Sequence, residues 1–327
     1  MYVNASRTAV AVATATAALL MSGCAGTGAA ADPASTPNTS PSPTDTGPAA
    51  RIPGTLWYES SSNDDWRLAR LNGSALTGVL RGDDVLNVQV SPDGQHLAYV
   101  DQAGHLTVAN ADGTDPQILH SATETFGYGP NWSADGTRLL VEVDTRDDSI
   151  PGVETVAAKA FTPLPKAIKD GLHFTFTGDG TRIFYTDGVL DLFSAAADGT
   201  DIRRVPVLGN QDPKVNPKDL RVGDIVSVNA DGSRVTVDLH RGEQPDGDIA
   251  GSDYANAVID TATGAVVPLP VQGTVTQALY QADGTLLVRT VLRKRATLTE
   301  LSPTLQVLAV QPEPAGVGAY QLHDWTR

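Results

Sequence analysis

The stretch that decides the fold is SPDGQHLAY, residues 91–99, in which an Asp-Gly pair stands ahead of a short apolar segment. Asp-Gly pairs recur with aspartates at positions 135, 179, 231 and 283, so the successive steps are 42, 44, 52 and 52 residues. Glycine adopts positive φ without steric cost and aspartate tolerates it, so Asp-Gly between extended segments predicts a tight hairpin turn. A hairpin that returns at this period predicts a repeated four-stranded unit.

Alignment of the five repeats on the aspartate produces columns of constant character. The position three before it is always apolar, the position two before it is always polar, and the position four after it is apolar again (Leu97, Leu139, Ile183, Val235 and Leu287). The flanking segments alternate with the period of a β-strand, most cleanly over residues 235–239. A second turn signal, ADGTD, follows at 111–115 and 197–201, 19 residues after the first mark in both repeats. Each repeat therefore predicts four strands.

The segments outside the five repeats complete a ring. Residues 55–60, 66–71 and 75–80 predict three strands of a blade that lacks its first strand, and residues 318–325 predict a single strand without a blade. In the fifth repeat, residues 241–253 are an insertion ahead of a turn at residues 263–264. We predict an all-β fold over residues 54–327: a six-bladed β-propeller of four-stranded blades, closed by the C-terminal strand completing the first blade.

The N-terminal segment has the layout of an export signal. Arg7 precedes an uncharged run from Thr8 to Met21, and Cys24, the only cysteine of the chain, ends the tetrapeptide MSGC. This tetrapeptide resembles the bacterial lipobox, with Met21 where leucine is usual. The resemblance implies that residues 1–23 are a lipoprotein signal peptide, that Cys24 is acylated (palmitate is one expected lipid), and that the chain is anchored on the extracytoplasmic side of the cell membrane. A cleaved signal with a coincidental cysteine is the alternative.

Residues 24–53 are rich in Pro, Ser, Thr, Gly and Ala and contain almost no residue able to form a core. Such a composition predicts a disordered tether. The stretch 91–99 and its weaker copies at 132–139 and 176–183 resemble the PD40 (WD40-like) repeat of TolB-type propellers. The resemblance implies a TolB-like propeller from about residue 52 onward, and it implies little about activity. We expect the N-terminal domain of TolB to be absent from this chain.

Catalytic signatures are missing from the sequence, which contains no HExxH, no GxSxG and no P-loop. The histidines (His96, His105, His120, His173, His240 and His323) are scattered without ligand spacing, and the acidic stretches 144–148 and 246–248 lack the spacing of calcium loops. The basic run 293–295 predicts an exposed turn in the last blade. We therefore name no catalytic, metal or cofactor-binding residue. A net charge of −15 argues against nucleic acid as a partner.

Two classes of function remain. The first is a lipid-anchored, non-catalytic binding or scaffold module, expected to be a monomer, which takes a protein or small-molecule ligand at a propeller face. The second is a lactonase-type or esterase-type hydrolase with Ca²⁺ held in the central channel. Four or more Asp, Asn, Glu or His side chains converging at the channel mouth would favour the enzyme.

Overall fold

The computed structural model describes residues 51–59, 68–81, 85–123, 129–145, 149–168, 171–187, 191–206, 220–241, 254–317 and 320–327. The chain divides into two units, residues 1–46 and 47–327, and every described residue belongs to the second. The predicted signal peptide, Cys24 and all but the last residues of the predicted tether lie outside the described ranges. Within those ranges, no helix has the length and hydropathy needed to cross a membrane.

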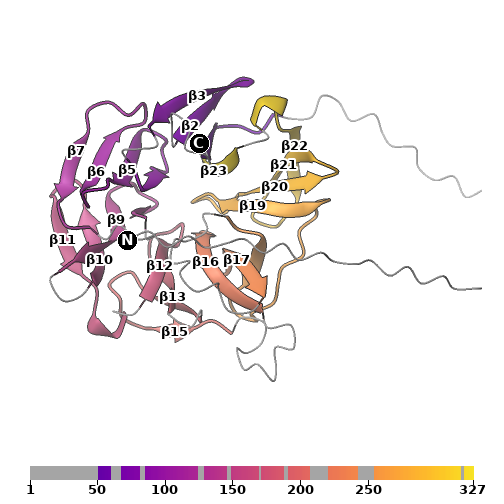
Figure 1. The fold of residues 1–327 in the computed structure, drawn as a ribbon. Coiled ribbons are helices and arrows are strands. Elements are labelled where there is room, and N and C mark those ends of the chain that lie inside the picture. Colours follow the sequence, from indigo (N-terminus) through magenta and orange to yellow (C-terminus); the bar gives the residue numbers. More distant parts are fainter. Residues whose placement is uncertain are drawn as a thin grey trace, which may run out of the picture. The chain divides into compact units, whose positions relative to one another are not determined.

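The described strands form six antiparallel sheets arranged in a ring, one sheet to each blade (Figure 1). In each blade the innermost strand is named first and the outermost last. Blade one is β23 (Gln321–Thr326), β1 (Thr55–Glu59), β2 (Leu68–Asn72) and β3 (Ala75–Leu80); blade two is β4 (Asn87–Val90), β5 (His96–Val100), β6 (Leu106–Asn110) and β7 (Gln117–His120); blade three is β8 (Asn131–Trp132), β9 (Arg138–Asp144), β10 (Ser149–Thr155) and β11 (Ala160–Pro163).

The second half of the ring follows the same plan. Blade four is β12 (Gly171–Phe176), β13 (Arg182–Asp187), β14 (Leu192–Ala196) and β15 (Arg203–Arg204); blade five is β16 (Leu220–Val228), β17 (Arg234–Arg241) and β18 (Ala257–Asp260); blade six is β19 (Thr274–Tyr280), β20 (Leu286–Leu292), β21 (Arg295–Leu301) and β22 (Val307–Pro312). Among the described residues, two short 3-10 helices, η1 (Lys166–Ile168) and η3 (Ala315–Val317), lie between strands. The predicted six-bladed propeller is confirmed.

The C-terminal strand closes the ring as the sequence predicts, because β23 pairs with β1 over Thr55–Glu59. Strict alternation along the predicted strand 318–325 would place Leu322 and Trp325 on opposite faces, but both side chains are buried in β23. A β-bulge at His323 shifts the alternation by one residue, so Leu322 and Trp325 face the same core.

Blade five differs from the others in its outer edge. Its fourth strand is reduced to one β-bridge, between Ile259 and Val266. The segment that would extend this strand contains Pro268 and Pro270, which have no N–H to donate to a ladder. The insertion predicted over residues 241–253 falls between β17 and β18, as expected, and residues 242–253 lie outside the described part of the chain.

The Asp-Gly turns explain the columns of the repeat. In blade three, Asp135 accepts hydrogen bonds from the Ser133 hydroxyl (2.6 Å) and from the Thr137 N–H (3.0 Å). The Ser133 bond, followed by those from Thr137, holds the pKa of Asp135 below its ordinary value, although burial opposes this. Each following glycine has positive φ, between 65° and 84° (Gly94, Gly136, Gly180, Gly232 and Gly284). The turn aspartates are therefore structural, as predicted.

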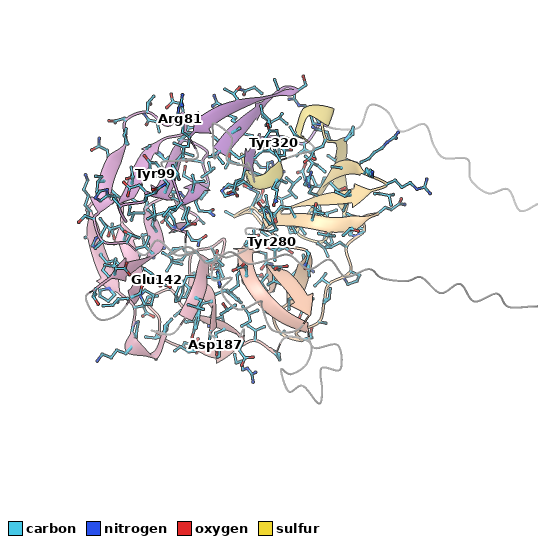
Figure 2. All side chains as sticks on the ribbon, viewed as in Figure 1. Arg81, Tyr99, Glu142, Asp187, Tyr280 and Tyr320 are labelled. Carbon is cyan, nitrogen blue, oxygen red and sulfur yellow. The ribbon has the colours of Figure 1, made fainter. Side chains whose placement is uncertain are left out.

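Side chains project from all the blades of the ring (Figure 2), and hydrophobic ones pack between neighbouring blades. Six buried clusters occur among the described residues, one at each of the six interfaces between neighbouring blades. The interface of blades six and one, for example, buries Leu279 and Leu287 against Leu56 and Trp325. A buried aliphatic or aromatic side chain stabilises a fold by about 1.5–3 kcal/mol. Each blade thus buries apolar side chains against both of its neighbours.

Candidate functional site: the central channel

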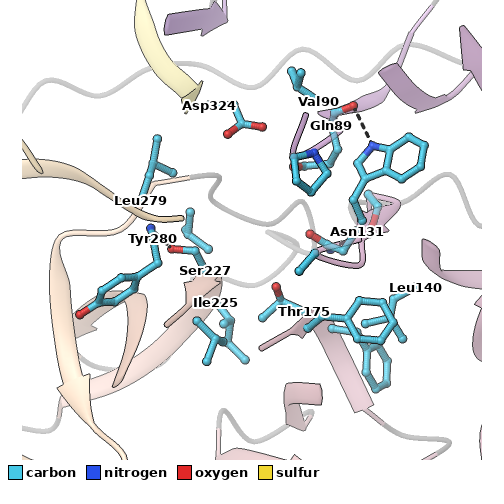
Figure 3. Close-up of a pocket in the computed structure, with 18 of the residues that line it drawn as sticks. Gln89, Val90, Asn131, Leu140, Thr175, Ile225, Ser227, Leu279, Tyr280 and Asp324 are labelled. Carbon is cyan, nitrogen blue, oxygen red and sulfur yellow. Dashed lines mark hydrogen bonds between the residues drawn. The ribbon is translucent and has the colours of Figure 1, made fainter. Parts of the chain in front are cut away.

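The innermost strands of the six blades surround a cavity of about 180 Å³ on the axis of the ring. Every blade contributes lining residues, so the cavity is a property of the closed ring and not of any one blade. Figure 3 shows Asn131, Thr175 and Asp324 pointing toward the same space from three blades, whereas the ring of Tyr280 points away from it. The cavity wall combines apolar side chains with many polar ones, among them Asn131, Thr175 and Asp324.

Four innermost strands, β12, β16, β19 and β23, contain β-bulges. The extra residue interrupts the alternation and turns one additional side chain toward the axis. The bulges bring His173 in β12, Asp224 in β16 and His323 in β23 into the cavity wall. His173 also has a φ of +54°, a left-handed conformation that costs free energy for a residue with a side chain. The inner strands that form the cavity wall therefore depart from regular β geometry where they place these side chains.

His173 and Asp224 form an ion pair between blades four and five. The distance from His173 Nδ1 to Asp224 Oδ1 is 2.5 Å, and the two side chains are only 10% and 3% exposed. Because Asp224 lines the same cavity, this pair places a carboxylate and an imidazole beside any molecule that enters the channel.

A second histidine stands in the wall between blades one and two. His323 Nε2 lies 2.8 Å from the carbonyl oxygen of Val88, and His323 Nδ1 lies 3.5 Å from Glu59 Oε2. Its neighbour Asp324 accepts a hydrogen bond from the N–H of Trp325 at 2.6 Å. Burial raises the pKa of Asp324. Electrostatic attraction to His323 and the backbone hydrogen bonds that Asp324 accepts oppose this rise but do not cancel it.

Hydrogen bonds between innermost strands hold the wall in place. Trp132 in blade three donates from its indole nitrogen to the carbonyl of Gln89 in blade two, at 3.4 Å (Figure 3). Blade six is linked to blade five by a hydrogen bond from the Tyr280 N–H to Ser227 Oγ (2.9 Å). It is linked to blade one by a hydrogen bond from Gln277 Nε2 to the Leu322 carbonyl (3.0 Å). These links fix the positions of the lining side chains before any ligand binds, which reduces the entropy cost of binding.

The Asp-Gly turns converge at one end of the cavity. The residue just before the turn aspartate is small in all five repeats (Pro92, Ala134, Gly178, Ala230 and Ala282), and four of these residues line the cavity. A Cβ on Gly178 would lie 2.9 Å from Ala230 Cα and 2.9 Å from the Ala282 carbonyl oxygen. The turns of blades four, five and six therefore meet closely and narrow this end.

The sequence candidates divide into several groups. His96 is exposed on β5, as predicted, and Arg293 and Lys294 form the tight turn between β20 and β21. His105 bonds Asp101 at 2.8 Å, away from the channel. Of the acidic stretches, Asp144 ends β9, while residues 146–148 and 246–248 lie outside the described ranges, as does the side chain of His240.

His120 lies near a buried carboxyl group. Its Nδ1 is 3.9 Å from Glu154 Oε2, and Glu154 is fully buried between blades two and three. Burial raises the pKa of Glu154, and no hydrogen bond reaches either of its carboxyl oxygens within the described chain. This pair belongs to the blade interface and not to the channel.

The fold brings two of the scattered histidines, His173 and His323, to the channel together with Asp224 and Asp324, which no spacing along the sequence indicates. Seven lining residues are of the type that would favour an enzyme (Asn87, Asn131, Glu142, His173, Asp224, His323 and Asp324). No group of three or more His, Cys, Asp or Glu side chains among the described residues is placed to hold a metal ion.

Solved structures resemble this fold, whereas no protein-family model and no curated protein matches the chain. TolB from Acinetobacter baumannii is similar over 79% of this chain, with 15% identity and a TM-score of 0.51, and the match spans 63% of the length of that TolB. An oligogalacturonate lyase in complex with manganese is similar over 75% of this chain and 71% of its own, with 13% identity and a TM-score of 0.50. At such identities the likeness is one of fold alone. The chain is accordingly a six-bladed β-propeller, similar in fold to TolB.

Proposed function

We propose that this protein is a non-catalytic binding or scaffold module whose ligand site is the central channel. The observation that supports this proposal is the cavity itself: six blades shape it, bulged strands aim polar side chains into it, and hydrogen bonds between blades hold those side chains in place. A rigid, partly polar cavity of this kind suits recognition of a small molecule or of a single protruding group of a larger partner.

The calcium-dependent lactonase or esterase is the alternative. Its support is the number of Asp, Asn, Glu and His side chains in the wall, together with the His173–Asp224 pair. Against it, the described residues contain no group of three or more His, Cys, Asp or Glu side chains suited to hold a metal ion. Hydrolysis of a lactone or an aryl ester that requires added Ca²⁺ and disappears in a His173→Gln variant would favour this alternative.

A channel-filling substitution tests the binding proposal. Thr175 points into the cavity from β12 (Figure 3), so Thr175→Phe places a ring there, whereas Thr304→Phe adds the same group to an exposed turn. In a thermal-shift screen of small cationic, neutral and anionic compounds, we expect at least one class to raise the unfolding midpoint of the parent and of Thr304→Phe. The same compounds should leave Thr175→Phe unchanged. A ligand at about 100 times its Kd stabilises the folded state by about 2.7 kcal/mol.

Equal stabilisation of Thr175→Phe by every active compound would place the binding site elsewhere and reject the channel. A screen in which no class acts on the parent would reject the small-molecule form of the proposal.

We also propose that the module is held at the extracytoplasmic face of the cell membrane by lipid on Cys24. The support is the lipobox-like tetrapeptide after an uncharged run. Two acyl chains attach a protein stably where a single chain does not. In detergent phase separation, the full chain should partition into the detergent phase and Cys24→Ala into the aqueous phase. Partition of both forms into the aqueous phase would contradict the anchor.

A further inference from the structure

The geometry of blade six points to a second surface: we infer that its outer rim rests on the membrane and contacts anionic lipid headgroups. This blade-six rim consists of residues 292–295, at the turn between β20 and β21, and residues 307–310 of β22. The inference rests on the proposed tethering of the chain at Cys24 and goes beyond it by naming the side of the propeller that faces the bilayer. Three observations carry it: exposed apolar side chains, a basic turn, and the place where the preceding chain joins the propeller.

The first observation is exposed apolar surface on blade six. Seven large hydrophobic side chains are exposed among the described residues, and four of them belong to this blade: Leu292, Val307, Leu308 and Val310. β22 is the outermost strand of its sheet and contains no charged residue (Figure 1). Natural edge strands are commonly protected by charged side chains, and β22 lacks that protection. A strip of exposed apolar side chains on a folded protein indicates an interaction surface.

The second observation is the basic run Arg293-Lys294-Arg295 at the end of the same blade. All three side chains are exposed, and no ion pair joins them to a carboxylate of the described chain. The other exposed run of arginines, β15 in blade four, is neutralised by aspartates at 2.7 Å and 2.6 Å. In a chain with a net charge of −15, the blade-six rim is therefore a local positive surface beside apolar side chains.

The backbone of this turn adds to the second observation. Arg293 and Lys294 have φ values of +49° and +67°, a conformation that glycine adopts without steric cost and that is unfavourable for residues with a side chain. The corresponding turn between β5 and β6 in blade two contains Gly104, with a φ of +78°. Blade six thus places two long cationic side chains where the backbone favours glycine, a departure typical of functional surfaces.

The third observation is the point at which the preceding chain joins the ring. Ile52 is buried in the same hydrophobic cluster as Ala309 of β22, and its N–H donates to Gln311 Oε1 at 3.3 Å. The chain therefore reaches the propeller beside β22, and Arg51, the residue before, is exposed there. Residues 24–51 connect this point to Cys24, and a flexible chain of that length spans about 30 Å on average. A membrane tether at Cys24 therefore brings blade six close to the bilayer, and blade three lies on the opposite side of the ring (Figure 1).

An anionic membrane surface matches this combination of groups. Exposed apolar side chains enter the boundary between headgroups and acyl chains, and the basic side chains pair with phosphate. The tether keeps the surface at a high effective concentration, so a contact too weak to hold a free protein is still populated. The acidic remainder of the surface is repelled by the same lipids, which favours one orientation of the propeller.

A pair of fluorescent probes tests the orientation. The full chain with Cys24→Ala and an N-terminal histidine tag can be held on vesicles by a nickel-chelating lipid, so the test does not depend on acylation. Because Cys24 is the only cysteine, Leu308→Cys or Ile118→Cys then carries the only label. Both side chains lie on outermost strands and both are 51% exposed, but Ile118 belongs to blade two. On phosphatidylcholine vesicles that contain phosphatidylglycerol, a nitroxide-labelled headgroup should quench the probe at residue 308 and not the probe at residue 118.

Charge variants connect the contact to the basic turn. Arg293→Gln with Lys294→Gln should lower the ratio of docked to undocked propeller by about 30-fold, because each basic residue near an anionic surface contributes a factor of about five. Arg203→Gln with Arg204→Gln removes two charges from β15 and should leave the quenching unchanged. Added salt, or omission of phosphatidylglycerol, should also reduce quenching at residue 308. Arg295→Gln, outside the two positive-φ positions, replaces the double variant if that one does not fold.

The inference fails if the two probes are quenched equally, if neither is quenched, or if the two double variants behave alike. Dimerisation of the untethered chain that Leu308→Asp removes would assign β22 to a second copy of the protein and overturn the membrane contact. The acylation of Cys24 is tested separately by detergent partition. Loss of that partition together with selective quenching at residue 308 would reject the lipid and retain the orientation, and the reverse result would retain the lipid and reject the orientation.

Discussion

Deletion of residues 318–327 should abolish the cooperative unfolding transition and leave an aggregating protein. The deletion removes β23, the innermost strand of blade one, and with it the buried side chains of Leu322 and Trp325. The edge of β1 would then present unpaired backbone groups, a template for pairing between molecules. Differential scanning calorimetry with size-exclusion chromatography measures both effects.

The contacts of β23 explain the size of this effect. The Trp57 indole donates to Thr326 Oγ1 at 3.0 Å, the Trp325 indole donates to the Pro53 carbonyl at 2.8 Å, and His323 contacts Val88 in blade two. Gln277 of blade six also donates to the Leu322 carbonyl, so the strand joins blade one to both of its neighbours. Trp325→Ala alone should lower the free energy of unfolding by about 3–5 kcal/mol, because it empties a fully buried site.

Deletion of residues 25–50 is the matched control, because it removes a segment near the other terminus and none of the described residues. We expect its unfolding midpoint to equal that of the parent. A C-terminal truncation that stays monomeric with an unchanged midpoint would contradict ring closure by β23.

Arg289→Met should lower the free energy of unfolding by about 3–5 kcal/mol, because it leaves a buried carboxylate without its cation. Arg289 holds Glu313 by two bonds of 2.8 Å, and the Glu313 side chain is 2% exposed. Tyr58 donates to the same carboxylate at 3.0 Å, and burial, followed by the charge of Glu313, raises the pKa of Tyr58. Chemical denaturation of the variant at neutral pH measures the loss.

A double variant tests this explanation. Arg289→Met combined with Glu313→Leu removes both charges, so it should recover much of the stability that Arg289→Met loses. A buried ion pair replaced by apolar side chains is often neutral or stabilising. If the double variant is as unstable as the sum of the two single variants, the two residues contribute independently and the proposed cause is wrong.

Most of the fold can be predicted from the sequence because its repeat is carried by local chemistry. The Asp-Gly turn, the polar residue two before it and the apolar residue four after it each act within a single hairpin, as the bonds of Asp135 show. The six-blade count follows from these turns and from the leftover strands. The reduced outer strand of blade five was open to prediction too, since Pro268 and Pro270 mark it.

The channel could not be predicted in the same way. Three residues, His173, Asp224 and His323, reach the cavity wall through β-bulges. A bulge inserts one extra residue into a strand, and the alternation of polar and apolar residues in the sequence does not show where it is inserted. His173 contacts Asp224 of the next blade and His323 contacts Val88 of another, so no spacing along the chain relates these residues to each other. One signal of the channel does stand in the sequence: the residue before each turn aspartate is small, and these residues narrow one end of the cavity.

Ring closure by β23 also determines when the native state can form during synthesis. The bond between Trp57 and Thr326 joins residues 269 positions apart, so blade one remains incomplete until β23 has been made. Contacts of such long sequence separation fold slowly, and an unpaired inner edge favours association between nascent chains. The earlier blades can form their local hairpins as they emerge, but none of them gains a closed ring before the last strand arrives. The ring can therefore close, and cover the unpaired edge of β1, only after β23 has been synthesised.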